Sequence, residues 1–211
     1  YIQYKEQNSA MRKAKKIIKD FNGDTHKTVL FLSYKAENWN TMDNIYKKYC
    51  QEKDIKVIVQ CVPYYYKNID GTFEKYIDGG MYPEYVTITP IEDYNYVNEN
   101  PDVIVFQYPY DNYNSAGTTD PVFYSYNLAS HTQKLIYIPY FRTDEIDEND
   151  MRAYTNMDAY VTMPGVVYAD KVIVQSEEIR KLYIKKLTDF FGEESEDEWE
   201  DKIEAEDIGG I

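Results

Sequence analysis

Short apolar runs separated by amphipathic segments make up most of this sequence. One run, Val-Ile-Val-Phe at residues 103–106, follows a Pro-Asp pair and ends at Tyr-Pro-Tyr, where a polar loop begins. β-Branched residues favour a strand, and proline ends it because it lacks an amide hydrogen. The same pattern recurs at residues 57–66 and 135–141. Three predicted strands therefore end in Pro-Tyr.

The other predicted elements continue this alternation. Residues 27–34 are apolar almost throughout, which is typical of a central strand. In the final unit, a strand that runs to Val174 is followed by Ser176, a good helix N-cap, and by two glutamates that oppose the helix dipole. Strands are predicted at residues 27–34, 55–62, 103–106, 133–138 and 169–174, and helices at residues 8–21, 41–51, 91–97, 121–129 and 151–163.

Strands that are apolar on both faces and alternate with helices indicate a parallel sheet covered on both sides. The prediction is an α/β fold, a Rossmann-like, mostly parallel sheet with helices on both faces. Residues 1–26 are predicted as a leading helix, residues 27–192 as the domain and residues 193–211 as an acidic tail. Residues 193–201 have the composition of a flexible segment, with a short helix pinned to the body by Trp199 and Ile203 as the alternative. Residues 64–90 show neither the helical nor the strand pattern of apolar residues, which predicts a functional loop or a small hairpin. An extra short strand is predicted at residues 85–89.

The carboxyl ends of parallel strands lie at one edge, and ligands of open α/β sheets bind in the crevice outside that edge. The three Pro-Tyr loops would then meet at one cleft. The alternative is that tyrosine is simply abundant, at 24 of 211 residues, and that proline only terminates strands. Both interpretations remain open at this stage.

The polar loop after residue 106 offers hydrogen-bonding groups beside flat rings, a mixture that suits a sugar or polyol. An Asx-rich turn that stabilises itself is the alternative. After the first strand, Lys35 and Trp39 could contact a phosphate and a ring, or could be a surface lysine and a core tryptophan. The candidate substrate-binding residues are Lys35, Trp39, Tyr64, Tyr65, Tyr110, Asp111, Asn112, Tyr113, Asn114 and Tyr140.

The net charge of −14 disfavours nucleic acid, whose phosphates attract clustered lysine and arginine. Residues 12–19 are a basic exception, interpreted as the solvated face of the leading helix or as a phosphate or membrane patch. No apolar run approaches the roughly 18 residues of a membrane span. The two cysteines, Cys50 and Cys61, do not resemble a disulfide framework, so reduced thiols in the cytosol are expected.

Signatures of cofactor and metal sites are missing. The sequence contains neither the glycine-rich dinucleotide fingerprint nor a P-loop. Its two histidines, His26 and His131, precede predicted strands and match no metal-ligand spacing. The acids of residues 144–150 could hold a divalent cation or could form a solvated connector. No cofactor and no metal are expected, and no catalytic residue is assigned.

Several segments together resemble a known family: KTVLFLSYKAENWNTMDNIYK, the loop of residues 64–85, NPDVIVFQYPYDNYN, KLIYIPYF and ADKVIVQSEEIRKLYIKKL. They are similar to the amino-terminal half of proteins related to the CDP-glycerol glycerophosphotransferases. Those are teichoic-acid-type cell-wall transferases of GT-B architecture, with two Rossmann-like domains that face each other across a cleft. The resemblance covers residues 27–190.

The resemblance implies that this chain is the acceptor-side domain, with a polyol, sugar or polymer as partner. The family's nucleotide-diphosphate site lies in a carboxyl-terminal domain, which would follow residues 207–211. A His-Gly motif that serves catalysis in the family is replaced here by Pro139-Tyr140-Phe141. The chain alone is therefore expected to be inactive and cytoplasmic, with peripheral membrane attachment open for the full-length protein. The alternative is a stand-alone, non-enzymatic module that binds a carbohydrate, a polyol or a protein.

Overall fold

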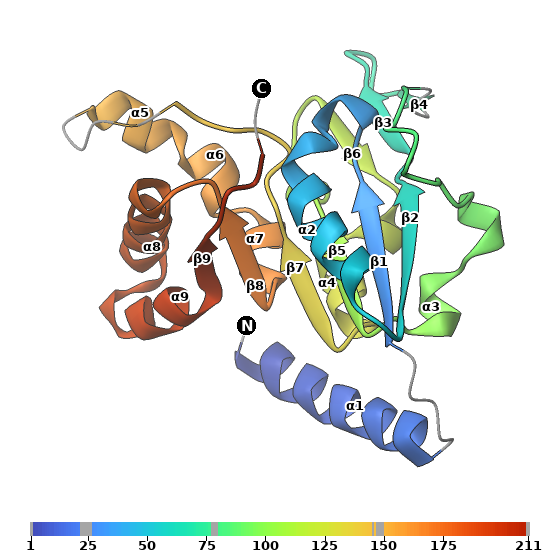
Figure 1. Ribbon diagram of the computed structural model, residues 1–211. Helices are drawn as coiled ribbons and strands as arrows, with labels where there is room; N and C mark the ends of the chain where they lie inside the picture. The colour runs from blue at the N-terminus through green and yellow to red at the C-terminus, as the bar shows by residue number, and fades with distance from the viewer. Residues whose placement is uncertain (1, 22–26, 77–79, 145, 147–149, 210–211) are drawn as a thin grey trace.

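The computed structural model describes residues 2–21, 27–76, 80–144, 146 and 150–209. At its centre lies a six-stranded sheet in the order β2-β1-β5-β7-β8-β9, in which every neighbouring pair is parallel (Figure 1). The strands are β1 (Lys27–Ser33), β2 (Ile55–Cys61), β5 (Val103–Phe106), β7 (Lys134–Tyr137), β8 (Lys171–Val174) and β9 (Ile203–Ala205). The predicted α/β, Rossmann-like parallel sheet is confirmed.

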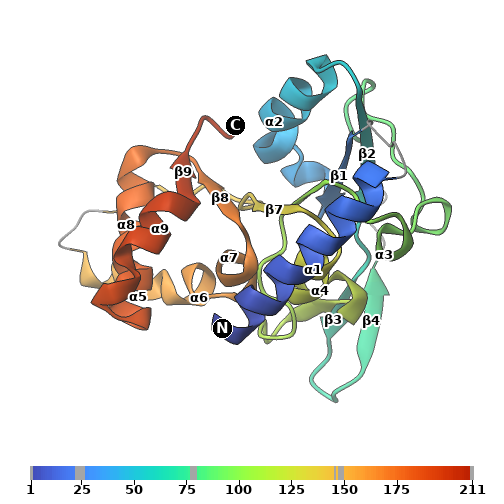
Figure 2. The ribbon, with the colours of Figure 1, turned by 90° about the horizontal axis from the view of Figure 1, so that it is seen from below.

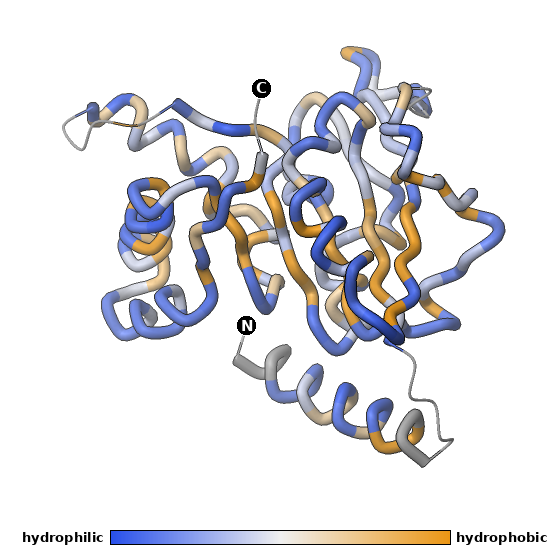
Figure 3. Tube along the Cα trace, viewed as in Figure 1, coloured by the Kyte–Doolittle hydropathy of each residue, from blue (hydrophilic) through white to orange (hydrophobic). Residues whose placement is uncertain are grey.

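Helices cover both faces of this sheet. Alternate residues of β1 point to opposite sides, so that Leu30 and Leu32 join one apolar cluster while Val29 and Phe31 join the other. Figure 3 shows the strands as the most apolar part of the chain. One face packs against α2 (Asn40–Gln51), and the other against α3 (Tyr96–Glu99), α4 (Ser125–Ser130), α6 (Asp158–Val161), α7 (Pro164–Tyr168), α8 (Glu177–Phe191) and α9 (Glu196–Lys202).

At the amino ends of the strands, one arrangement occurs twice. Asp102, just before β5, accepts the Thr28 N–H at 2.7 Å and donates its own N–H to the Thr28 carbonyl. Asp170, just before β8, accepts the Leu135 N–H at 2.7 Å and donates to the Leu135 carbonyl. Each aspartate thus satisfies backbone groups of the neighbouring strand where the ladder begins.

The long loop contains its own small sheet. β3 (Tyr64–Lys67) and β4 (Phe73–Tyr76) form the predicted hairpin, and the antiparallel β6 (Gly117–Thr119) adds a third strand that the sequence did not predict. The prediction of a short strand at residues 85–89 is wrong, because that segment forms only an isolated β-bridge between Ile88 and Val59.

The acidic tail is part of the domain. Residues 193–209 form η4 (Glu193–Ser195), α9 and β9, so the sheet extends past the boundary expected at residue 192. Trp199 and Ile208 are each 1 % exposed, and Ile203 is fully buried. These apolar side chains fix the segment to the core while its acids mostly face solvent, which explains why its composition resembled that of a flexible tail.

Several predicted helices have different limits. The helix expected at residues 151–163 is two short helices, α5 (Met151–Asn156) and α6, separated at the buried Met157. Residues 91–97 form η2 (Ile91–Asp93) and then α3, which Asn95 caps. Residues 121–129 form η3 (Pro121–Phe123) and α4, and η1 (Ala36–Asn38) precedes α2.

The leading helix α1 (Ile2–Phe21) begins earlier than the predicted residue 8. Asn22 and Gly23, a pair typical of the end of a helix, lie outside the described residues. Seen from below, α1 runs across the amino ends of the strands (Figure 2). Within the described ranges, no helix has the length and apolar character needed to cross a membrane.

The Ser176 cap gives a direct stability prediction. Its side-chain oxygen accepts the Ile179 N–H at 3.2 Å at the start of α8, as the sequence predicted. Ser176→Ala should lower the free energy of unfolding by about 1 kcal/mol because that donor loses its partner. Urea denaturation measures the change, with the exposed Ser115→Ala as the matched control. Equal effects of the two substitutions would contradict the capping role.

Candidate functional site

The sheet has a topological switch point between β1 and β5. The chain passes from β1 through α2 to β2 on one side, and later places β5 on the other side of β1. Ligands of open α/β sheets bind outside the carboxyl ends of the strands at such a point. In Figure 1 the parallel arrows of the six-stranded sheet run toward the edge that carries the candidate loops.

Five tyrosines from four of these loops lie together at this edge, and we call them the tyrosine rim: Tyr34, Tyr64, Tyr108, Tyr110 and Tyr140. The centroid of the Tyr34 ring is 4.8 Å from that of Tyr64, 5.1 Å from that of Tyr108 and 5.0 Å from that of Tyr140. The hydroxyl oxygens of Tyr110 and Tyr140 are 3.4 Å apart. The structure thus brings the three Pro-Tyr loops together around Tyr34.

The burial and protonation state of the five tyrosines determine which groups the rim presents to a ligand. Tyr64 and Tyr108 are buried, whereas Tyr34, Tyr110 and Tyr140 are half-buried. Burial raises the pKa of Tyr34, Tyr108 and Tyr110 well above the ordinary value, so these hydroxyls keep their protons at neutral pH. The rim therefore presents ring surfaces and neutral hydroxyl groups.

Lys35 places a cation beside these rings. Its Nζ lies 5.4 Å from the Tyr34 ring centroid, 5.3 Å from that of Tyr64 and 3.5 Å from a Glu37 carboxylate oxygen. Burial disfavours the ammonium, but Tyr34, Tyr66 and Glu37 outweigh it and raise the pKa of Lys35. The side chain stays charged, and it can offer hydrogen bonds to a phosphate or hydroxyl group.

Ring contacts extend the rim in both directions. On the hairpin side, Tyr66 packs against Tyr64 and Tyr76, with centroid distances of 5.3 and 6.0 Å. On the other side, Phe141 lies 5.0 Å from Tyr140 and 5.2 Å from Tyr160. The carboxyl edge thus carries a continuous row of aromatic side chains.

Other candidate residues have structural roles. Trp39 is only 2 % exposed and packs against Phe31, with its Nε1 donating to Asp43 at 3.1 Å, so it is the core tryptophan of the alternative interpretation. Tyr65 pairs through its backbone in the middle of the small sheet. Asn114 accepts the Ala116 N–H in a turn, as the Asx alternative stated. Asn112 and Tyr113 are exposed in the same loop, beside rather than within the rim.

Asp111 is committed to the body of the domain. It has a φ of 49°, is 4 % exposed and accepts both the N–H and the Oγ–H of Ser125, each at 2.8 Å. The carboxylate therefore holds the first residue of α4 instead of facing a ligand. Burial raises the pKa of Asp111 to about 6, although the Ser125 bonds act in the opposite direction.

This raised pKa predicts a pH effect on stability. The folded protein binds the proton of Asp111 more tightly than the unfolded chain does. The contribution of the protonated carboxyl to the free energy of unfolding is therefore complete below about pH 4 and is lost as the pH rises through 6. A shift of about two units corresponds to about 3 kcal/mol. Asp111→Asn cannot ionise, and its side-chain oxygen can still accept the Ser125 N–H.

Relative to the wild type, Asp111→Asn should therefore gain up to about 3 kcal/mol between pH 4 and pH 7. Urea denaturation across that range measures the difference in the free energy of unfolding. The exposed Asp93→Asn is the matched control and should run parallel to the wild type. A parallel curve for Asp111→Asn would contradict the assignment.

Three glutamines near the carboxyl ends of strands hold the loops of this edge and were not among the predicted site residues. Gln107 is fully buried: its Oε1 accepts the Tyr34 N–H at 3.0 Å, and its Nε2 donates to Asn38 O and Thr41 Oγ1, both at 2.9 Å. Gln60 donates to two loop carbonyls, and Gln175 exchanges hydrogen bonds with the backbone of a third loop. The signal was the repeated Val-Ile-Val-Gln at residues 57–60 and 172–175.

The histidines and acids give no second site at this edge. His131 bonds through Nδ1 to the Asn127 carbonyl and lies against Tyr96, before β7 as expected, while His26 is outside the described residues. Most of the acids at residues 144–150 also lie outside them. Within the described part of the chain, no three His, Cys, Asp or Glu residues are placed to hold a metal.

Comparison with known proteins indicates no function for this chain, so its function is inferred from the fold and from the geometry of the site. The chain matches no protein-family model, and neither curated proteins nor solved structures show a significant match.

Proposed function

We propose that this chain is an acceptor-binding domain that holds a polyol, a sugar or a polymer of such units at the tyrosine rim. The observation that carries the proposal is the position of Tyr34 at the switch point, within 5.1 Å of the rings of Tyr64, Tyr108 and Tyr140, with Lys35 beside it. A row of rings with protonated hydroxyls suits the apolar faces and hydroxyl groups of such ligands, and the ammonium suits a phosphate.

The domain is further proposed to be the amino-terminal part of a GT-B, CDP-glycerol glycerophosphotransferase-like enzyme. Support comes from the segments of residues 27–190 that resemble that family, and from the parallel sheet on which they lie. Proton transfer needs a base within hydrogen-bond reach of the acceptor. The carboxylate after β5, Asp111, is already bound to Ser125, so the base and the activated donor would come from a second domain.

A cytoplasmic location belongs to the same proposal, with peripheral attachment of the full-length protein to the membrane. Cys50 is exposed and Cys61 half-buried, and the two do not form a disulfide. Free thiols are usual in a reducing compartment, where teichoic-acid-type transferases take their nucleotide-activated donors.

Calorimetric titration of the chain with glycerol 3-phosphate, CDP-glycerol and CMP tests the proposal. Glycerol 3-phosphate should bind, and Tyr140→Ala and Lys35→Gln should each weaken it by about tenfold, the loss expected for one ring contact or one charge-assisted bond. Phe190→Ala removes an exposed ring on α8 and is the control. Equal effects of all three variants, or tight CMP binding at the rim, would overturn the assignment.

A stand-alone, non-enzymatic binding module is the second candidate. The hairpin of β3 and β4 and the loop after it favour this function because they expose Ile69, Phe73, Tyr76 and Met81 to solvent. A full-length protein with a downstream domain that carries a glycine-rich loop and a histidine supports the transferase. Binding of a polyol polymer without any transfer activity in the full-length protein supports the module.

A further inference from the structure

A cavity of about 420 Å³ lies at the opposite edge of the sheet from the tyrosine rim. It is bounded by α1 on one side and by residues 167–170, from the last turn of α7 to the start of β8, on the other. The polar residues in its lining include Asn8, Ser9, Arg12, Lys13, Lys16, Gln133 and Asp170. Its volume falls in the range of small-molecule sites in proteins.

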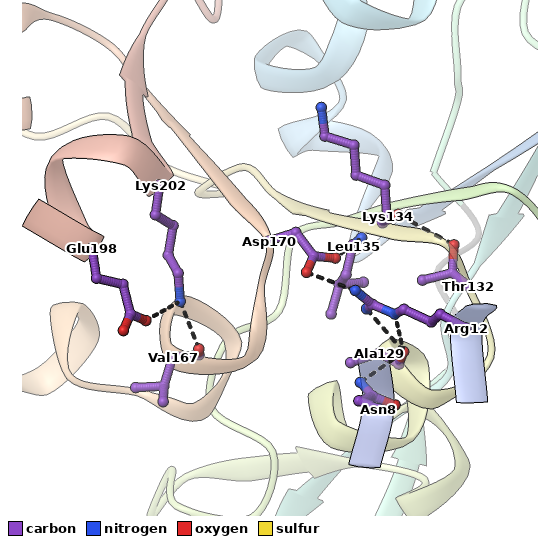
Figure 4. Close-up of polar contacts among 10 residues, drawn as sticks. All are labelled: Asn8, Arg12, Ala129, Thr132, Lys134, Leu135, Val167, Asp170, Glu198 and Lys202. Atoms are coloured by element: carbon purple, nitrogen blue, oxygen red, sulfur yellow. Dashed lines mark hydrogen bonds and ion pairs between the residues drawn. The ribbon is translucent and has the colours of Figure 1, made fainter. Parts of the chain in front are cut away.

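The wall that α1 provides is fixed by polar contacts to the body of the domain. Arg12 donates to the Ala129 carbonyl through Nε and Nη2, at 3.3 and 3.0 Å, and its Nη1 pairs with Asp170 at 2.7 Å (Figure 4). Asn8, which is 7 % exposed, donates to the same carbonyl at 3.2 Å. Gln133 donates to the Arg12 carbonyl at 3.1 Å. One buried side chain, Asn8, and three partly buried ones, Arg12, Gln133 and Asp170, therefore hold this wall in place through hydrogen bonds.

The charge of the lining contrasts with that of the chain. The protein carries a net charge of −14, yet the lining holds three cations against one carboxylate, Asp170. Arg12 pairs with that carboxylate, which leaves Lys13 and Lys16 as excess positive charge. They stand three residues apart on α1, a spacing that places side chains on one face of a helix. A small anion in the cavity would meet both ammonium groups.

We propose that this cavity binds a small phosphate-bearing anion. A guanidinium has five N–H donors, and the contacts of Arg12 with the described residues occupy three of them, so two remain for the oxygens of a ligand. Lys13 and Lys16 supply further donors and the charge that a phosphate requires. Within the basic stretch, Arg12, Lys13 and Lys16 would thus form a phosphate site and not only a solvated helix face.

The strength of the proposal lies in the combination of enclosure and charge. Exposed lysines on one helix face would be screened by salt and would not select a ligand. Lys13 and Lys16 are also exposed, but they border a cavity whose lining includes the buried Asn8 and the partly buried Arg12. An anion inside that cavity would lose part of its water, so its charge would be screened less than on an open helix face. The site lies away from the rim, so its test is independent of the proposed function.

The test is an NMR titration of the full chain with inorganic phosphate and with pyrophosphate, at constant ionic strength and against chloride. Saturable shifts are expected at residues 8–16, 133 and 167–170. Lys13→Gln combined with Lys16→Gln should weaken binding by about tenfold or more, since two charge-assisted contacts are lost. The unliganded double variant should keep the melting temperature of the wild type.

Lys53→Gln combined with Lys181→Gln is the matched control, because both side chains are exposed and the net charge changes equally. This control should bind both probes as the wild type does. The proposal is overturned if neither probe gives saturable shifts at these residues, or if the two double variants lose affinity equally. Binding to phosphatidylglycerol vesicles without binding to soluble phosphate or pyrophosphate would also overturn it.

Discussion

Gly165→Ala is expected to lower the free energy of unfolding by about 3 kcal/mol, because no space exists for one more carbon atom. A Cβ at this position would lie 2.5 Å from Pro109 Cα and 2.8 Å from Pro109 Cβ. The Gly165 N–H also donates to the Pro109 carbonyl at 2.8 Å. The start of α7 therefore packs directly against the Tyr-Pro-Tyr segment at residues 108–110. An alanine at residue 165 must displace either α7 or that segment.

Urea denaturation measures this loss, and rim binding reports whether the loop has moved. Gly71→Ala is the matched control: its φ of 81° strains alanine, but the new Cβ would meet nothing within 4 Å. That change should cost about 1 kcal/mol from the backbone alone. A Gly165→Ala variant no less stable than Gly71→Ala would show that α7 and the Pro109 loop are not in close contact.

Gln107→Leu should cost about 3 to 5 kcal/mol, although leucine has a similar volume. The amide joins the loop after β1 to the start of α2 through Tyr34, Asn38 and Thr41. Leucine leaves the Tyr34 N–H and the Asn38 carbonyl without this partner at a site where the glutamine is fully buried. Each buried polar group left unpaired costs about 1 to 3 kcal/mol.

Gln107→Leu should also weaken ligand binding at the rim, because the backbone N–H of Tyr34 loses the hydrogen bond to Gln107 that fixes this residue. Thermal and urea denaturation measure the first effect, and calorimetric titration with glycerol 3-phosphate measures the second. Gln51→Leu, at the exposed end of α2, is the control and should change neither. A stable Gln107→Leu protein would refute the role of the amide at the switch point.

The sequence predicted the sheet well because its strands are short apolar runs, a pattern that depends little on distant contacts. Residues 27–34, 55–62 and 103–106 gave β1, β2 and β5, and the hairpin in the long loop was also expected. The domain boundary at residue 192 was wrong for the opposite reason. Ten acids in residues 193–207 dominate the composition of the tail. Trp199 and Ile203 suggested a short helix held to the body, but the strand β9 depends on packing that no local pattern shows.

The candidate site was predicted in part. Proline and tyrosine at the strand ends were enough to place Tyr64, Tyr110 and Tyr140 at one edge, because parallel strands end together. Burial decided the other residues, and it cannot be read from a loop sequence. Trp39 is buried in the core, where its Nε1 donates to Asp43. Asp111 is buried and accepts the backbone N–H of Ser125, the first residue of α4.

The two edges of the sheet differ in chemistry. The carboxyl edge carries neutral tyrosines and one lysine, whereas the cavity at the amino edge carries three cations and one acid. On this difference we base the proposals of a polyol at the first edge and a small phosphate at the second. Gln107 and Gly165 fix the loops at the carboxyl edge, and Arg12 and Asn8 fix α1 at the amino edge.

Residue-resolved NMR during a titration with glycerol 3-phosphate tests the tyrosine rim most directly. We expect saturable shifts at Tyr34, Lys35, Tyr110 and Tyr140 that are separate from any shifts at residues 8–16. In Tyr140→Ala, the shifts at the remaining residues should need about tenfold more ligand. Shifts confined to the amino edge, or no saturable shifts at the ends of β1, β5 and β7, would contradict the assignment of the rim as the acceptor site.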